Sequence, residues 1–152
     1  MKNNKWYVIS TFVLGCIVIN FAGRILSDRL QLPLWLDSFG TVTAAYVLGP
    51  FCAAMVGMTV NLTYGILYSW TNMFYAVVSA MVGITTGICV KKGFLKNLYG
   101  VLSTSFLIAV LSVTLSVPLN YLYCDGSTQN IWGDGVIAVS YTHLRAHETR
   151  RH

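Results

Sequence analysis

The side chains best able to bind a small molecule are a few polar and aromatic residues within long apolar segments. Asp37 is a single carboxylate between the apolar residues 32–36 and the largely apolar residues 42–50. Because an ionisable group is costly to bury in a bilayer, such groups usually mark functional sites. Asp37 could therefore orient a ligand by charge-assisted hydrogen bonds. It could also cap the helix that follows, with Ser38 and Thr41 supporting the first turn, and the two roles are compatible.

Other candidate binding residues are amide, tyrosine and tryptophan side chains near the same end of the apolar segments. We assign substrate binding to Trp35, Asp37, Asn61, Tyr64, Asn120, Asn130, Trp132 and Asp134. The tryptophans could stack on a planar ligand and the polar groups could orient it, as in most small-molecule sites. Each type also has an architectural alternative, because asparagines join membrane helices and tryptophans form belts at the membrane interface.

Motifs of catalysis and metal binding are not found in the sequence. No phosphate-binding glycine loop, nucleophile elbow or kinase signature occurs. The four cysteines show no C-x-x-C spacing. The three within or at the ends of the expected spans are interpreted as small apolar fillers, and Cys124 is expected outside and unpaired, so no disulfide is assigned. We therefore expect a protein that is not an enzyme and that uses no cofactor and no metal.

The C-terminal residues 139–152 are interpreted as foreign to the natural fold. Their first ten residues, Val-Ser-Tyr-Thr-His-Leu-Arg-Ala-His-Glu, are similar to the translation of a sequencing transposase adapter. All three histidines lie in this tail, so the His143 and His147 spacing is not taken as a metal site. The natural domain is expected to comprise residues 1–138 and to be truncated at its C-terminus.

Composition and apolar runs predict an all-α, polytopic membrane helix bundle. Hydrophobic residues make up 55% of the chain and charged residues only 10%, whereas soluble domains carry about 25% charged residues. Five spans are expected within residues 6–26, 36–48, 51–68, 73–90 and 97–121, with a sixth span lost. The second is short, so either it is buried among its neighbours or residues 32–36 fold into the membrane.

The distribution of lysines predicts the orientation of the bundle. Lys2 and Lys5 precede the first span, and Lys91, Lys92 and Lys96 follow the fourth. Since cytoplasmic loops hold the excess of Lys and Arg, we expect a cell-membrane protein with a cytoplasmic N-terminus. An outer loop is expected to hold Arg24, Asp28, Arg29 and Asp37. Without the tail, seven Lys and Arg against four Asp give a formal charge of only +3, which gives no nucleic-acid footprint.

Two of the predicted spans carry small residues at four-residue spacing. The third has Ala53, Gly57, Asn61 and Gly65, and the fourth has Ser79, Gly83 and Gly87. Residues four apart share one helix face, and small faces let membrane helices approach closely. We expect the third and fourth spans to pack tightly.

The order of these features resembles the substrate-binding S components of energy-coupling-factor vitamin transporters. The resemblance covers roughly residues 6–134 and is carried by Leu-Pro-Leu-Trp-Leu-Asp-Ser-Phe-Gly-Thr (32–41), Ala-Ala-Tyr-Val-Leu-Gly-Pro-Phe (44–51) and Gly-Met-Thr-Val-Asn-Leu (57–62). It implies six helices, a lid at residues 32–36 and a pocket rim at residues 126–134. It also implies a small-molecule ligand, a membrane coupling protein and an ATPase pair as partners. Many such proteins dock through two alanines four apart on the first helix, where this chain has Thr11 and Gly15.

A second resemblance implies a different output. Residues 32–37 and Asn-Ile-Trp-Gly-Asp (130–134) are also similar to membrane sensor regions that precede a serine phosphatase or histidine kinase. In that alternative the same cavity would detect a ligand and pass a helix shift to a lost cytoplasmic domain. Our first hypothesis is uptake of a small vitamin-like molecule, and the sensor is the alternative.

Overall fold

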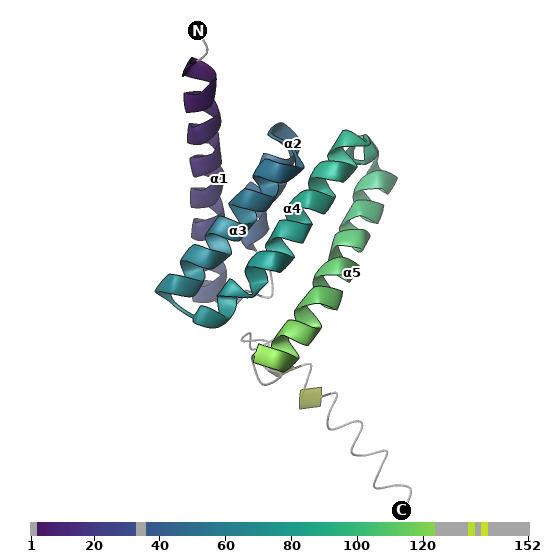
Figure 1. Cartoon of the computed structure of the whole chain (residues 1–152). Coiled ribbons are helices and arrows are strands. Elements are labelled where there is room, and N and C mark those ends of the chain that lie inside the picture. Colours follow the sequence, from purple (N-terminus) through teal and green to yellow (C-terminus); the bar gives the residue numbers. More distant parts are fainter. Residues whose placement is uncertain (1–2, 33–35, 124–133, 136–137, 140–152) are drawn as a thin grey trace, which may run out of the picture.

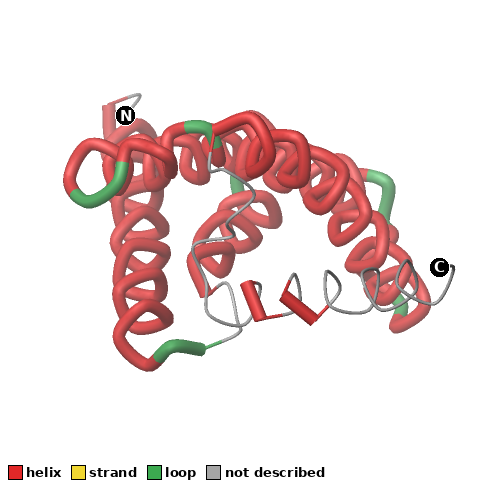
Figure 2. The backbone as a smooth tube through the Cα atoms, turned by 90° about the horizontal axis from the view of Figure 1, so that it is seen from below, coloured by secondary structure: helices red, strands yellow, loops and turns green. Residues whose placement is uncertain are grey.

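The computed structural model describes residues 3–32, 36–123, 134–135 and 138–139. It confirms the all-α helix bundle, with α1 (Asn3–Leu30), α2 (Phe39–Val47), α3 (Pro50–Leu67), α4 (Tyr75–Lys91) and α5 (Leu98–Tyr123). Single turns of 3-10 helix occur at η1 (Leu36–Ser38), η2 (Trp70–Met73) and η3 (Phe94–Lys96). Figure 2 shows that helices joined by short loops make up nearly all of the described backbone.

Four helical segments are long and apolar enough to cross a membrane, and they support assignment of the chain as a membrane protein. They are Lys5–Leu30, Pro50–Leu67, Trp70–Lys91 and Leu98–Tyr123. Large apolar side chains on their outer faces are exposed, including Trp6, Phe51, Ile66 and Phe106. Such a surface suits a lipid solvent, in which apolar side chains need no further cover.

The second predicted span is only a half-length helix. The nine residues of α2 rise about 14 Å, less than half of a hydrocarbon core of about 30 Å. Gly40, Thr41, Ala44 and Ala45 are buried, and α2 packs against α1, α3 and α4. This agrees with the first explanation for the short segment, burial among its neighbours.

Helices α3, α4 and α5 stand side by side in that order (Figure 1). Helix α1 packs against α2 and α3, and the short α2 packs against both α3 and α4. The N-terminus, the α2–α3 turn and the α4–α5 turn lie at one end of the molecule in that view. The end of α1, the α3–α4 connection and the end of α5 lie at the other. We call these two ends of the bundle the N-terminal end and the η2 end.

The predicted tight packing of α3 on α4 is confirmed. A methyl group at Gly57 would lie 3.0 Å from Ser79 Cβ, and one at Gly83 would lie 2.7 Å from the Ala53 carbonyl carbon. At the end of this face, a methyl group at Gly87 would come within 2.4 Å of Pro50 Cα. Glycine and alanine thus set the separation of these helices.

Local signals explain where α1 ends and where α3 begins. Gln31 has a positive φ of 50°, and the Leu32 N–H donates to the Ser27 carbonyl at 3.1 Å, which is typical of a left-handed C-terminal cap. Gly49 has φ +92°, a conformation that favours glycine. Pro50 then occupies the first position of α3, where its missing N–H is not needed.

Candidate functional site

Charged side chains of α1 meet polar groups of three other elements at the η2 end. The expectation that Arg24, Asp28 and Arg29 lie in a loop was wrong, because α1 continues through Leu30. A helical backbone places Arg24 and Asp28 on one face, four positions apart, where opposite charges attract. Arg24 Nε lies 3.7 Å from Asp28 Oδ2. The pair therefore belongs to the last turns of the first span.

Arg24 is the centre of this group. Its Nη1 donates to Asp37 Oδ2 at 3.2 Å, and its Nη2 donates to Asn72 Oδ1 at 2.8 Å. The Arg24 and Asp37 side chains are only 12% and 10% exposed. A planar guanidinium with five N–H donors can hold several acceptors at once. We call Arg24, Asp28, Asp37, Tyr64 and Asn72 the Arg24 cluster; it joins α1, η1, α3 and η2.

Aromatic rings form a wall beside the guanidinium. Arg24 Cζ lies 4.9 Å from the centre of the Tyr64 ring, close enough for a cation–π interaction. Tyr64 stacks on Tyr68 with centroids 4.6 Å apart, and Phe21 meets Tyr64 edge-on at 5.9 Å. The Tyr64 hydroxyl donates to Asp28. The wall therefore combines flat apolar surface with fixed polar groups.

The Arg24 cluster contains two carboxylates and one guanidinium. The Asp28 side chain is 48% exposed, so it is far more accessible than Arg24 or Asp37. Carboxylate oxygens accept hydrogen bonds, and the guanidinium donates them. A small molecule bearing both hydrogen-bond donors and acceptors could thus be held here without any covalent bond being made or broken.

The interpretation of Asp37 as a helix cap was wrong. Ser38 stands at the N-cap of α2 and makes no side-chain cap hydrogen bond. Asp37 lies in η1, where its Oδ2 accepts from Arg24 and its Oδ1 lies 3.5 Å from Ser38 Oγ. Thr41 also does not support a cap, since its hydroxyl oxygen accepts from Asn20 Nδ2 at 2.9 Å. The carboxylate is therefore committed to an ion pair.

Two predicted binding residues bond elsewhere in the bundle. Asn61 Nδ2 donates to Ser79 Oγ at 2.7 Å, and Asn61 is 4% exposed at the α3–α4 contact. Asn120 Oδ1 accepts from the Tyr75 hydroxyl, which joins α5 to the start of α4. Both contacts correspond to the architectural alternative, in which asparagines connect helices. Of the predicted set, Asp37 and Tyr64 meet in the structure, because both contact Arg24.

The remaining predicted residues are placed as follows. Trp35, Asn130 and Trp132 lie outside the described residues, as do residues 140–152 of the expected foreign tail; Asp134 is described and is partly buried. Thr11 is exposed on α1 and its hydroxyl donates to the Tyr7 carbonyl at 2.8 Å. Gly15 is also exposed, and a methyl group there would meet nothing within 4 Å. The proposed docking positions are thus open on the outer face of α1.

Sequence reasoning missed four residues that build the site. Arg24, Asp28 and Asn72 belong to the cluster, and Asn20 positions the start of α2 by accepting the Gly40 N–H at 2.5 Å. The spacing of Arg24 and Asp28 was a usable signal for a helical pair. Asn20, fully buried and polar within an apolar span, was a second. No pattern distinguishes Asn72 from an ordinary loop residue.

Replacing Asn61 by alanine is expected to cost about 1 kcal/mol of stability, because one interhelical hydrogen bond in a membrane protein contributes about that much. Unfolding in mixed micelles of increasing denaturing detergent content would measure the loss. Thr63→Ala, at an exposed position of the same helix, is the control and should stay within about 0.5 kcal/mol. Equal losses in both variants would contradict the role assigned to the Asn61–Ser79 bond.

Among the residues that the structure describes, no group of three or more His, Cys, Asp or Glu side chains is placed to hold a metal ion. Comparisons with protein-family models, curated proteins and solved structures found no match to the chain.

Proposed function

We propose that this chain is a membrane substrate-binding subunit for uptake of a small vitamin-like molecule, which it binds at the Arg24 cluster. The observation that carries the proposal is the largely buried Arg24–Asp37 ion pair at 3.2 Å. Burying such a pair brings little net stability, because desolvation offsets the attraction. Ionisable groups in membrane helices are accordingly associated with ligand and ion sites.

The cluster has the chemistry that a small heterocyclic ligand requires. The rings of Phe21, Tyr64 and Tyr68 offer stacking surface. Arg24 supplies donors, and Asp37 supplies an acceptor. A ligand inserted at this point would exchange the internal ion pair for bonds of the same kind, so little hydrogen bonding would be lost on binding. Such a subunit performs no chemistry of its own.

Transport requires partners in this proposal. A membrane coupling protein and an ATPase pair would supply the energy, since the sequence contains no nucleotide-binding motif. The exposed Thr11 and Gly15 positions on α1 leave room for a helix of the coupling protein to approach closely. The lipid bilayer covers the remaining apolar faces.

A ligand-sensing domain is the second candidate, and one observation favours it. Arg24 connects α1 to η1 and to η2, so a ligand that displaced either bond would change how α1 is held against its neighbours. A sensor needs such a two-state contact. The two candidates differ in outcome, because only the transporter subunit accumulates its ligand.

The test is retention of radiolabelled water-soluble vitamins by the purified full-length protein. Asp37→Asn is expected to weaken retention of the bound vitamin by about 1 to 3 kcal/mol, because a charge-assisted bond becomes a neutral one. Trp35→Ala is the companion variant, which removes a predicted stacking wall. Arg29→Gln is the control, since it changes a charge on an exposed residue of the same helix, and it should retain the vitamin fully.

Uptake separates the two candidates. Cells that express the chain together with a coupling protein and an ATPase pair should accumulate the retained vitamin, and cells lacking the ATPase pair should not. Retention without accumulation under both conditions would favour the sensor. A protein that retains no vitamin, or an Asp37→Asn variant that binds as well as the unchanged protein, would contradict binding at the Arg24 cluster.

A further inference from the structure

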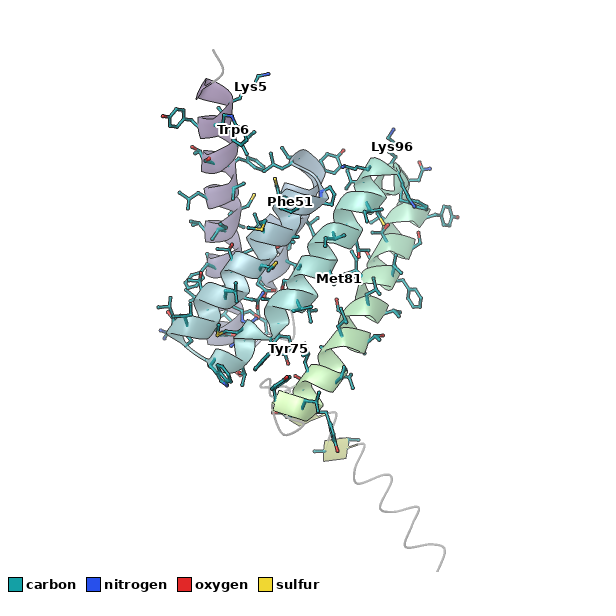
Figure 3. All side chains as sticks on the ribbon, viewed as in Figure 1. Lys5, Trp6, Phe51, Tyr75, Met81 and Lys96 are labelled. Atoms are coloured by element: carbon teal, nitrogen blue, oxygen red, sulfur yellow. The ribbon has the colours of Figure 1, made fainter. Side chains whose placement is uncertain are left out.

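Positive charge gathers in the turn between α4 and α5, at the N-terminal end. Lys91 is the last residue of α4, Lys92 caps that helix and Lys96 ends η3. All three side chains are exposed. Figure 3 shows Lys96 at the same end of the molecule as Lys5 and far from Tyr75. We call Lys91, Lys92 and Lys96 the lysine turn.

The lysine turn has no carboxylate partner within residues 3–32 and 36–123. The acids of these two segments are Asp28 and Asp37, and both belong to the Arg24 cluster at the η2 end. Three exposed ammonium groups are therefore close in sequence and lie away from both carboxylates of these segments. Such a group attracts anions, most strongly at low ionic strength.

Two of the lysine stems, those of Lys91 and Lys96, lie next to glycine turns. Gly93 has φ +76°, and its N–H donates to the Val90 carbonyl at 2.9 Å. A methyl group at Gly93 would lie 3.7 Å from Lys96 Cε, and one at Gly49 would lie 3.7 Å from Lys91 Cε. The aliphatic stems thus lie over the two turns. Long lysine side chains placed this way can extend their charges to the membrane interface.

Large apolar side chains flank the same turn. Phe94, Leu98 and Tyr99 are 50%, 72% and 86% exposed. They surround the point where α5, a helix long and apolar enough to span a membrane, begins. Aromatic residues at such a position lie at headgroup depth. The surface thus offers cations for a phosphate and apolar contacts for the glycerol and upper acyl chains.

We propose that the lysine turn binds the phosphate headgroup of an anionic phospholipid. Charge complementarity selects an anion, and the exposed apolar side chains select a lipid over a soluble protein. Basic groups next to membrane helices bind acidic lipids by this combination. The site is separate from the Arg24 cluster, so it stands whether or not that cluster binds a vitamin.

The test measures lipid binding to the detergent-solubilised full chain by native mass spectrometry. The probes are phosphatidylglycerol and phosphatidylcholine. Phosphatidylglycerol is expected to bind about tenfold more tightly, and the preference should shrink with added salt. Lys91→Gln, Lys92→Gln and Lys96→Gln combined should abolish the preference. A matched triple variant, Lys2→Gln, Lys5→Gln and Arg29→Gln, removes the same charge elsewhere and should keep most of it.

Four further results would support or overturn lipid binding at the lysine turn. The charge-conserving variant Lys91→Arg, Lys92→Arg and Lys96→Arg should keep the preference, which provides a test even if the glutamine variant does not fold. Equal binding of both lipids by the unchanged protein would overturn the proposal. Equal losses in the two charge-removing variants would overturn it as well, because they would indicate a general surface effect. Full competition by millimolar inorganic phosphate would point to a soluble anion instead.

Discussion

Replacing Arg24 by alanine is expected to destabilise the protein by about 3 to 5 kcal/mol, the usual cost of removing one partner of a buried ion pair. Asp37 would keep its charge at a position only 10% exposed. The side-chain amide oxygen of Asn72, a residue that is 4% exposed, would lose the hydrogen bond that it accepts from the guanidinium. Unfolding by denaturing detergent, followed by circular dichroism, would measure the loss.

A double-mutant cycle tests the physical reason for this loss. Arg24→Ala combined with Asp37→Ala should be less destabilised than the sum of the single variants, because the double variant has no unpaired carboxylate at position 37. Arg29→Ala is the matched control on the same helix; its side chain is exposed, so its effect should stay within about 0.5 kcal/mol. Similar losses for Arg24→Ala and Arg29→Ala would show that the ion pair contributes nothing specific.

Gly40→Ala is expected to cost about 3 kcal/mol, at the upper end of the usual effect of overpacking. The added methyl group would lie 2.1 Å from the Cys16 carbonyl oxygen and 2.8 Å from Asn20 Oδ1. The carbonyl belongs to the backbone of α1, so α1 and α2 must move apart. That movement should also lengthen the Arg24–Asp37 contact, because η1 leads directly into α2. Thermal unfolding in detergent, together with vitamin retention, would record both effects.

Gly15→Ala is the control for this prediction. It adds the same methyl group to α1 at a position where nothing lies within 4 Å. Since alanine is favoured over glycine in a helix by about 1 kcal/mol, stability should be unchanged or slightly raised. A loss of vitamin uptake with normal retention in this variant would point to docking of the coupling protein at Gly15. Equal destabilisation by the two substitutions would contradict the close approach of α1 and α2.

Much of the fold followed from local pattern. Long apolar runs predicted the helices because a membrane interior requires every backbone group to be paired within the segment. The four-residue spacing of Gly57 and Asn61, and of Gly83 and Gly87, predicted which faces of α3 and α4 meet. These signals act within one helix or between helices adjacent in the chain, so sequence alone was sufficient to identify them.

The site depended on contacts that no local pattern encodes. Arg24 and Asn72 are 48 positions apart, and their meeting depends on how α1 lies against the α3–α4 connection. The lone Asp37 was recognised as a candidate ligand-binding group and, alternatively, as a cap of the helix next to it, but its partner in the structure, Arg24, lies 13 positions earlier. Reading α1 as ending early placed Arg24 in a loop. Had the helix been extended to Leu30, the Arg24–Asp28 pair would have followed.

The length of α1 gives the depth of the Arg24 cluster. Arg24 follows Lys5 by 19 positions within one continuous helix, a rise of about 28 Å. That distance nearly equals the hydrocarbon thickness of a typical bilayer, about 30 Å. With Lys5 at one water boundary, the guanidinium lies at the opposite boundary and the last turns of α1 extend beyond it. A polar solute can therefore approach the cluster from the aqueous side, at its exposed member Asp28, without first partitioning into lipid.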